Sequence, residues 1–259
     1  MSSIFATNAA VIAGIMFVLW LLSVLKRDVS IVDLIWGPGF AVVALVTRSL
    51  SDSRSLPSEL LCWLACVWGV RLGLYLAWRN HGRPEDYRYQ QMRERRGESF
   101  WLSSLWIVFG LQGVVMWIVS LPLQVGIAAT DQPHSWLVIP GVLSWLVGFF
   151  FETVGDWQLA RFRANPENKG QLLRTGVWKF TRHPNYFGDF AIWWGLFLIA
   201  ASSSEAWWTI ISPLLMTVFL RYVSGVALLE KSLSNSKPGY EDYAARTNAF
   251  FPWPPRTQR

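Results

Sequence analysis

The sequence predicts an all-α polytopic membrane protein with seven transmembrane helices. Of the 259 residues, 53% are hydrophobic, and they include 17 Trp and 16 Phe. Seven apolar runs have the length of about 20 residues that a helix needs to cross a bilayer core. Lys and Arg gather in alternate loops between these runs, as expected of a chain that crosses a membrane repeatedly.

The predicted spans follow one another along the whole chain. We place them at roughly residues 6–25, 29–47, 58–78, 101–123, 136–158, 185–203 and 207–229. The first run has no basic segment before it and is long enough to remain as a span, so we expect no cleavable signal peptide. We treat residues 1–259 as a single transmembrane domain.

The basic residues predict the orientation of these spans. The first, third and fifth loops and the C-terminal tail hold nineteen Lys and Arg, whereas the second loop holds two and the fourth and sixth hold none. Because basic loops stay in the cytoplasm, we expect the N-terminus outside and the C-terminus in the cytoplasm. The excess of 23 Lys and Arg over 17 acids therefore indicates a membrane surface and not a nucleic acid.

Several classes of site are absent from the sequence. The three histidines, His81, His134 and His183, are too few for a histidine-rich di-iron centre, and no Cys/His cluster has zinc spacing, so we expect no metal. Cys62 and Cys66 lie one helical turn apart, which favours packing over a disulfide. Motifs of hydrolases, Walker nucleotidases and soluble dinucleotide-binding folds do not occur.

Polar side chains recur near the cytoplasmic ends of the predicted spans. Spacings of three or four residues place them on common helix faces. Ionisable groups at this depth are tolerated where they face the bundle interior or a wet cavity. We therefore predict a polar cavity open to the cytoplasm; the alternative is a structural network, with Arg71 paired to Asp33 as one candidate. The residues are Asp33, Arg71, Tyr75, Glu152, Asp156, Arg163, Asn185, Asp189 and Glu230.

The mixture of side chains suggests the ligand of this cavity. Arginine forks match phosphate oxygens, carboxylates and amides match ribose hydroxyls or a carboxamide, and aromatic rings match a flat base. This points to a phosphorylated nucleotide beneath a membrane-embedded pocket for a lipid. The arginines for the phosphate are Arg71, Arg83, Arg163 and Arg174. The residues for ribose or a carboxamide are Asp156, Asp189 and Asn185, and the aromatic residues for the base are Tyr75, Trp178 and Tyr186.

Four stretches resemble a known family. They are VDLIWGPGF (32–40), RNHGRPEDYRYQ (79–90), LLRTGVWKFTRHPNYFGDFAIWWG (172–195) and LLEKSL followed by PGYEDYAARTNAFFPW (228–253). Together they resemble the steroid 5α-reductase family, and within it an uncharacterised bacterial branch. The resemblance covers nearly the whole chain and is most specific over the last 110 residues.

This resemblance implies a seven-helix membrane reductase. Such an enzyme uses NADPH to saturate a carbon–carbon double bond conjugated to a ketone, in a steroid-like or other lipid substrate drawn from the bilayer. The cofactor site would face the cytoplasm of a bacterial inner membrane. Residues 1–100 would carry the substrate side and the first cofactor arginines, and residues 135–259 the cofactor-binding portion.

The resemblance also implies roles for single residues. Asp156 and Arg163 would hold the adenosine side of the cofactor, and Asn185 and Asp189 its nicotinamide end. Only arginines would read the 2′-phosphate that distinguishes NADPH from NADH. Trp36 and Trp68 would contact the substrate. The full set of implied cofactor residues is Arg71, Tyr75, Arg83, Asp156, Arg163, Arg174, His183, Asn185, Tyr186, Asp189, Glu230, Tyr240 and Tyr243.

The catalytic pair of the family departs from its usual form here. The family's Glu on helix 2 and Tyr on helix 3 correspond to Asp33 and Trp68. Because Trp lacks an acidic hydroxyl, we assign Tyr87 as the second catalytic residue, with Tyr89 as the alternative. A carboxyl in an apolar pocket stays protonated and donates to a substrate carbonyl, whereas one paired with an arginine ionises and orients other groups.

Two rival functions stay open at this point. Membrane methyltransferases that use S-adenosylmethionine, such as isoprenylcysteine carboxyl methyltransferase, share the stretch 182–188 (RHPNYFG), Glu230 and a tail with Tyr240, Tyr243 and Arg246. A lipid-binding or transport protein is the second rival, although we find no internal repeat. The sequence leaves open the lipid and the oligomeric state.

Overall fold

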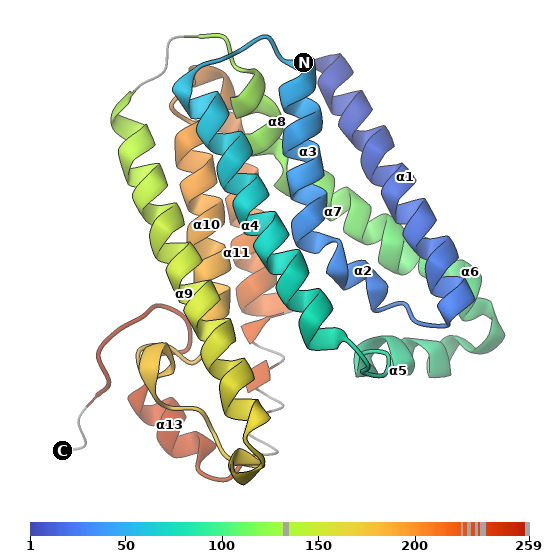
Figure 1. Ribbon diagram of the computed structural model, residues 1–259, viewed down its shortest axis with the longest axis vertical. Helices are drawn as coiled ribbons and strands as arrows, with labels where there is room; N and C mark the ends of the chain where they lie inside the picture. Colours follow the sequence, from blue (N-terminus) through green and yellow to red (C-terminus); the bar gives the residue numbers. More distant parts are fainter. Residues whose placement is uncertain (132–134, 224, 227–228, 231–232, 234–236, 257–259) are drawn as a thin grey trace. The chain divides into compact units, whose positions relative to one another are not determined.

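The prediction of an all-α membrane protein is confirmed. The computed structural model (Figure 1) describes residues 1–131, 135–223, 225–226, 229–230, 233 and 237–256. The protein is 80% helix, and the described residues form no strand. His134 lies outside the described residues.

Two compact units make up the chain. The first comprises Met1–Ser135 and Ile199–Thr209, and the second comprises Trp136–Leu198 and Ile210–Arg259. Helices of the first unit are α1 (Ser2–Lys26), α2 (Ile31–Leu34), α3 (Trp36–Leu50), α4 (Leu56–Asn80), α5 (Tyr87–Arg96), η1 (Gly97–Ser99), α6 (Phe100–Ser104), η2 (Leu105–Gly110), α7 (Leu111–Val119) and α8 (Leu121–Ala128).

The second unit contains two long helices, α9 and α10, several shorter ones and a C-terminal segment. Its described helices are η3 (Ser135–Leu137), α9 (Val138–Ala164), η4 (Pro166–Asn168), η5 (Gly176–Lys179), α10 (Pro184–Ala200), α11 (Ile211–Val218), η7 (Phe219–Val223) and α13 (Tyr240–Arg246), while η6 (Ser204–Ile210) lies in the first unit except for its last residue. The boundary between the units falls inside η3, α10 and η6.

Within the described part of the chain, five helical stretches are long and apolar enough to cross a membrane. They are Ser2–Lys26, Leu56–Asn80, Tyr87–Ala128, Val138–Ala164 and Ser204–Val223. The run predicted as the second span forms α2 and α3, and the run predicted as the sixth forms α10; α3 and α10 have 15 and 17 residues. At about 1.5 Å per residue, a helix of 15 residues covers only about 22 Å of a core near 30 Å.

The second predicted span, 29–47, is not one continuous helix. The helix ends at Leu34 and begins again at Trp36. Pro38 explains this break, because a proline ring clashes with the carbonyl four residues before it, here that of Leu34. Asp33 therefore lies on a separate short helix, α2.

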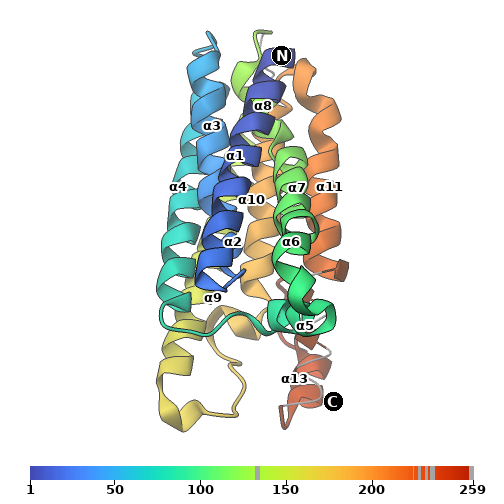
Figure 2. The ribbon, with the colours of Figure 1, turned by 90° about the vertical axis from the view of Figure 1, so that its right-hand side faces the viewer.

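Glycines let α3 and α4 approach closely in the first unit (Figure 2). A methyl group on Gly37 would lie 2.5 Å from the carbonyl oxygen of Gly69, and one on Gly73 would lie 2.4 Å from the Pro38 ring. Such contacts through small residues are typical of membrane helices. They fix the position of α3 beside α4.

A buried polar cluster joins the first turns of α1, the last turns of α3 and helix α8. The Asn8 amide donates to the Thr47 hydroxyl at 2.8 Å and to the Gln124 carbonyl oxygen at 3.3 Å. All three side chains are fully buried. Since apolar surroundings strengthen such hydrogen bonds, this cluster fixes the alignment of the three helices.

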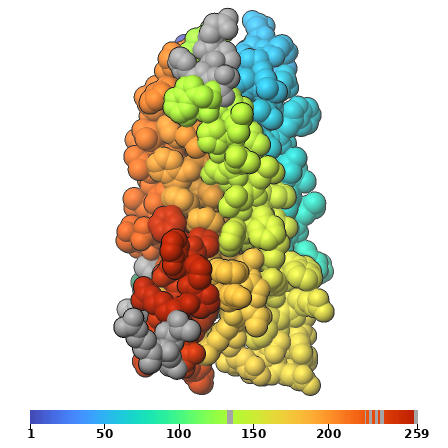
Figure 3. Space-filling view, turned by 90° about the vertical axis from the view of Figure 1, so that its left-hand side faces the viewer, coloured from blue at the N-terminus to red at the C-terminus, as the bar shows by residue number. Residues whose placement is uncertain are grey.

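In the second unit the C-terminal segment returns to the start of α10 (Figure 3). The Arg182 backbone N–H donates to the Asn248 carbonyl at 2.9 Å, and the Thr181 hydroxyl donates to the Phe250 carbonyl at 2.8 Å. The Trp253 N–H donates to the Phe180 carbonyl at 2.9 Å. These bonds hold α13 against the segment that precedes α10.

Candidate functional site

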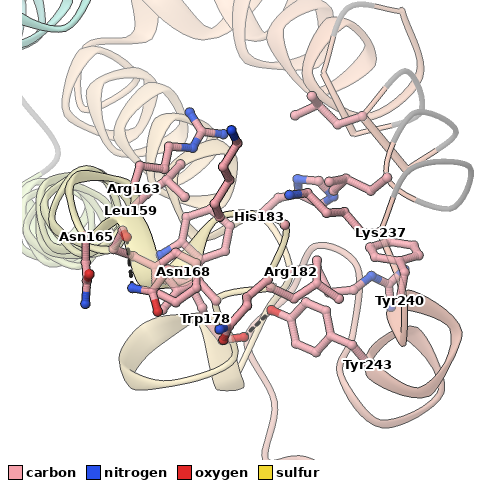
Figure 4. Close-up of a pocket in the computed structure, with 18 of the residues that line it drawn as sticks. Leu159, Arg163, Asn165, Asn168, Trp178, Arg182, His183, Lys237, Tyr240 and Tyr243 are labelled. Carbon is pink, nitrogen blue, oxygen red and sulfur yellow. Dashed lines mark hydrogen bonds between the residues drawn. The ribbon is translucent and has the colours of Figure 1, made fainter.

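A cavity of about 440 Å³ lies in the second unit, at the C-terminal end of α9 (Figure 4). Its walls come from the last turn of α9, the loop after it, the start of α10, and the C-terminal segment with α13. The polar and aromatic lining residues are Phe162, Arg163, Asn165, Asn168, Lys169, Gln171, Trp178, Arg182, His183, Asn185, Lys237, Tyr240 and Tyr243. This volume is typical of small-molecule sites.

Local turn chemistry shapes the loop after α9. The Asn165 side chain accepts a hydrogen bond from the Glu167 N–H at 3.0 Å, and the Asn168 amide donates to the Phe162 carbonyl at 2.9 Å. Gly176 has a φ of 62°, and a methyl group there would lie 2.2 Å from Gln158. Asn caps and a left-handed glycine therefore turn the chain back toward the cavity.

Glu230 joins Arg182 and His183 beside the cavity. The Arg182 Nε donates to one Glu230 oxygen at 2.9 Å, and His183 Nε2 lies 2.8 Å from the same oxygen. Arg182 also donates to the carbonyls of Ala244 and Thr247. The cluster thus ties the start of α10 to the C-terminal segment.

The charge state of Glu230 follows from these contacts. Partial burial raises the pKa of this carboxyl, but hydrogen bonds from His183 and Arg182, with Tyr240 nearby, more than offset that effect and hold the pKa well below its usual range. Glu230 is therefore ionised at neutral pH, and the hydrogen bond to His183 requires the proton on Nε2.

An aromatic wall closes another side of the cavity. The Tyr243 hydroxyl donates to the Trp178 carbonyl, and the Trp178 indole N–H donates to the Gly155 carbonyl at 3.1 Å. Arg174 donates to the Gly239 carbonyl at 2.6 Å and lies 5.8 Å from the Tyr243 ring centre. The rings of Trp178 and Tyr243 are thereby fixed before any ligand binds.

Residues predicted from the start of α10 meet residues of α9. The Asn185 amide donates to the Asp156 carboxylate at 3.4 Å, and Asp156 is buried. The rings of His183 and Tyr186 stack with centres 5.8 Å apart. Asp189 follows one turn later on α10. The structure thus gathers seven predicted residues in or against the cavity wall: Asp156, Arg163, Arg174, His183, Asn185, Tyr240 and Tyr243.

The cavity lining carries one sign of charge. Among its residues in the described part of the chain, four are cationic, Arg163, Lys169, Arg182 and Lys237, and none is Asp or Glu. Arg182 is neutralised by Glu230 just outside the lining. A lining with cationic and no acidic side chains among its described residues suits an anionic ligand.

Asp33 lies in the first unit, within a second polar cluster. The Tyr89 hydroxyl donates to the Asp33 carboxylate at 2.9 Å and accepts from the Gln112 amide at 3.2 Å. Arg88 donates to the other Asp33 oxygen at 3.3 Å. Tyr87, which the sequence analysis assigned as catalytic, is 59% exposed, and the phenol on Asp33 belongs to Tyr89.

The other predicted residues of the first unit lie on α3 and α4 or follow them. The Arg71 guanidinium lies 5.3 Å from the Tyr75 ring centre, as their spacing of four predicts. Trp36 and Trp68 both contact Phe40, with ring centres 5.4 and 5.8 Å apart. Trp68 is fully buried. Arg83 is exposed in the turn after α4.

Lys169, Lys237 and Arg182 were not among the predicted site residues. Each of the three could have been predicted from the sequence. Arg182 directly precedes the predicted His183, and the two lysines lie in the basic loop and tail that we expect in the cytoplasm. Only the return of the C-terminal segment brings Lys237 to the wall of the cavity. Gln158 could not have been predicted, because its side-chain oxygen accepts a hydrogen bond from the backbone N–H of Val177, at 3.0 Å, and this contact depends on the fold.

These features define an all-helical membrane protein with a basic, aromatic cavity at the C-terminal end of α9. Residues 19–247 match the family described as "Protein of unknown function (DUF1295)", and the chain belongs to this family. It is a membrane family that resembles steroid 5α-reductase.

Two curated relatives are similar to the chain. An uncharacterised protein of Schizosaccharomyces pombe is 26% identical over 269 residues, covering 91% of this chain and 76% of the relative. The nickel-cobalt-cadmium resistance protein NccN of Alcaligenes xylosoxydans xylosoxydans is 28% identical over 143 residues, 55% of this chain and 63% of that protein. No solved structure was found to match.

Proposed function

We propose that this protein is a membrane-embedded, NADPH-dependent reductase. It saturates a carbon–carbon double bond conjugated to a ketone, in a steroid-like or other lipid that enters from the bilayer. The observation that carries the proposal is the lining of the cavity, which in the described residues has four cations and no carboxylate. A phosphorylated nucleotide needs such a lining.

The residues of the cavity fit parts of this cofactor. Arg163 and Lys169, at the end of α9 and in the next loop, suit phosphate oxygens. The ring of Trp178, held by Gly155, suits a flat base. Asn185, fixed by Asp156, suits a hydroxyl or carboxamide group. The cofactor supplies the hydride for the reduction.

The cluster around Asp33 suits the other half of the reaction. Saturation of an enone requires a donor to the carbonyl oxygen as negative charge develops there. Tyr89 is the donor in our proposal: its single hydroxyl proton, which is donated to Asp33 in this structure, turns to the carbonyl oxygen when substrate binds, while Gln112 keeps donating to the phenol oxygen. Arg88 donates to the other Asp33 oxygen and holds the carboxyl group in place.

Cofactor binding tests the proposal. We expect NADPH to bind more tightly than NADH, and the Arg163→Gln variant to weaken NADPH binding by about tenfold or more, because it loses a charged hydrogen bond. Calorimetry on the purified full chain measures both. Arg161→Gln is the matched control, since Arg161 lies on the same last turns of α9 but outside the lining. Equal affinity for NADPH and NADH would contradict the proposal.

The orientation in the membrane is a separate prediction. The proposal has seven spans, with α3 and α10 crossing as short helices, in a bacterial inner membrane. Accessibility tags at residue 129 are expected on the outer side, and tags at residues 92, 170 and the C-terminus on the cytoplasmic side. A tag at residue 170 that is reached only from outside would remove the cavity from the cytoplasmic nucleotide pool.

A methyltransferase is the second candidate. The contact of Glu230 with Arg182 and His183, beside Tyr240 and Tyr243, brings together the residues shared with isoprenylcysteine carboxyl methyltransferases. S-adenosylmethionine has no phosphate, so the cationic lining offers it fewer favourable contacts than it offers NADPH. Tighter binding of S-adenosylmethionine than of NADPH in the same calorimetry would favour this candidate.

A further inference from the structure

A second cavity lies within the first unit, and none of its lining residues belongs to the two sites described above. It has a volume of about 740 Å³ and lies where α1 ends and where α5 passes into α6. Its walls include the apolar side chains of Val24, Phe100 and Trp101 and the charged side chains of Arg27 and Glu98.

This cavity lies at the polar end of two candidate spans. One is Ser2–Lys26, and the other is Tyr87–Ala128, whose apolar part begins at Phe100. Large apolar side chains beside the cavity are open to the surroundings, with Leu25 80% and Trp101 51% exposed. Exposed Trp at the end of a span is typical of the level of lipid headgroups.

Trp101 is fixed in this position. Its backbone carbonyl accepts a hydrogen bond from the Trp20 indole N–H at 2.8 Å, and the two indole rings stack with centres 6.3 Å apart. A wall of this kind can pack against the first segments of an acyl chain without reorganising.

A third charged residue of the lining, Arg93, is already neutralised. It donates to both Glu85 oxygens at 3.1 and 2.8 Å and to the Arg27 carbonyl at 3.3 Å, and it lies 4.8 Å from the Phe100 ring centre. Among the described residues, neither Arg27 nor Glu98 forms an ion pair. The cavity therefore offers one cation and one carboxylate to a ligand.

Arg27 has an uncommon backbone. Its φ of 53° and ψ of 36° are left-handed, and within the described residues it is the one non-glycine residue with positive φ. Glycine or asparagine adopts this conformation more readily than a long side chain. A cation at this helix end, in place of either, is consistent with a role in binding.

We propose that this cavity binds one zwitterionic phospholipid whose headgroup carries a primary ammonium, of the phosphatidylethanolamine type. Arg27 donates to the phosphate, and Glu98 accepts from the ammonium. The acyl chains extend along the exposed apolar surfaces of α1 and α6. A trimethylated ammonium has no N–H to donate to Glu98, and a glycerol headgroup has no positive charge, so both alternatives fit less well.

Native mass spectrometry of the full chain in detergent tests this proposal with three probes: dioleoyl phosphatidylethanolamine, phosphatidylcholine and phosphatidylglycerol. We expect phosphatidylethanolamine to bind about tenfold more tightly than the other two. Glu98→Gln should remove this preference. Arg27→Asn, which suits the left-handed backbone, should weaken all three lipids by about tenfold.

Matched controls separate a site from a charged surface. Glu94 and Arg96 lie on the same helical end but outside the cavity lining, so Glu94→Gln and Arg96→Gln should keep the preference and the affinity. Thermal unfolding of each variant without lipid checks that Glu98→Gln folds as the wild type does. The proposal is overturned if the wild type binds the ethanolamine and choline lipids equally, or if it binds phosphatidylglycerol most tightly. It is also overturned if Glu94→Gln and Glu98→Gln have the same effect.

Discussion

Tyr89→Phe and Asp33→Asn are each expected to slow reduction of a lipid enone by about 100-fold or more, the usual scale for a positioned proton donor. The Tyr89 hydroxyl is the group that lies on Asp33, at 2.9 Å, and Gln112 fixes its oxygen. Phe removes the hydroxyl, and Asn replaces one of the two oxygens that accept from Tyr89 and Arg88 with an amide nitrogen. The rate is measured with saturating NADPH, together with the NADPH affinity, which should stay within about twofold because neither residue lines the cofactor cavity.

Tyr87→Phe is the matched control for this experiment. Tyr87 lies two residues earlier on α5 and is 59% exposed, so its hydroxyl should be dispensable. A 100-fold loss in Tyr87→Phe with an active Tyr89→Phe would instead support the assignment made from the sequence. If Asp33 only docks α2 onto α5, Asp33→Asn should lower the unfolding temperature and leave the rate per folded molecule unchanged.

Glu230→Gln is expected to destabilise the second unit by about 3 kcal/mol, at the lower end of the range for breaking a buried ion pair. The Arg182 side chain is 10% exposed and would lose its charged partner, and His183 would lose a charged acceptor. Unfolding of the detergent-solubilised protein, followed by circular dichroism, measures the change. Asp242→Asn is the matched control: the Arg246–Asp242 pair is 44% and 61% exposed, so its loss should have little effect.

The pH dependence of this difference follows from the lowered pKa of Glu230. A carboxyl whose pKa is lower in the folded state stabilises the fold above its unfolded value, about 4.3, and loses that contribution as the pH falls through the folded pKa. The difference between wild type and Glu230→Gln should therefore be constant from about pH 6 to pH 8 and shrink below about pH 4. A difference that grows on acidification would contradict the ionised state of Glu230.

Periodicity and composition were enough to predict the helical class and the local faces. Residue spacing alone predicts which side chains share a face of a helix. On α4, Arg71 contacts Tyr75 as this spacing predicts, and at the start of α10, Asn185 contacts the buried Asp156. Apolar runs likewise predicted where helices lie. They did not predict the break at Ile35, although Pro38 was visible, because an apolar run reports burial and not continuity of the backbone.

The sequence by itself determined that this protein is an all-helical membrane protein with basic and aromatic residues around the start of α10. The tertiary structure decided which of those residues share a wall. The Asp33 carboxylate contacts Tyr89 and not Tyr87. Both tyrosines lie on helix α5, and side chains two residues apart on a helix point to different faces. Lys237, Tyr240 and Tyr243 reach the cavity because the C-terminal segment returns to Arg182, through hydrogen bonds between residues more than 60 positions apart. Contacts over such separations leave no periodic signal in a single sequence, so only the fold could place them.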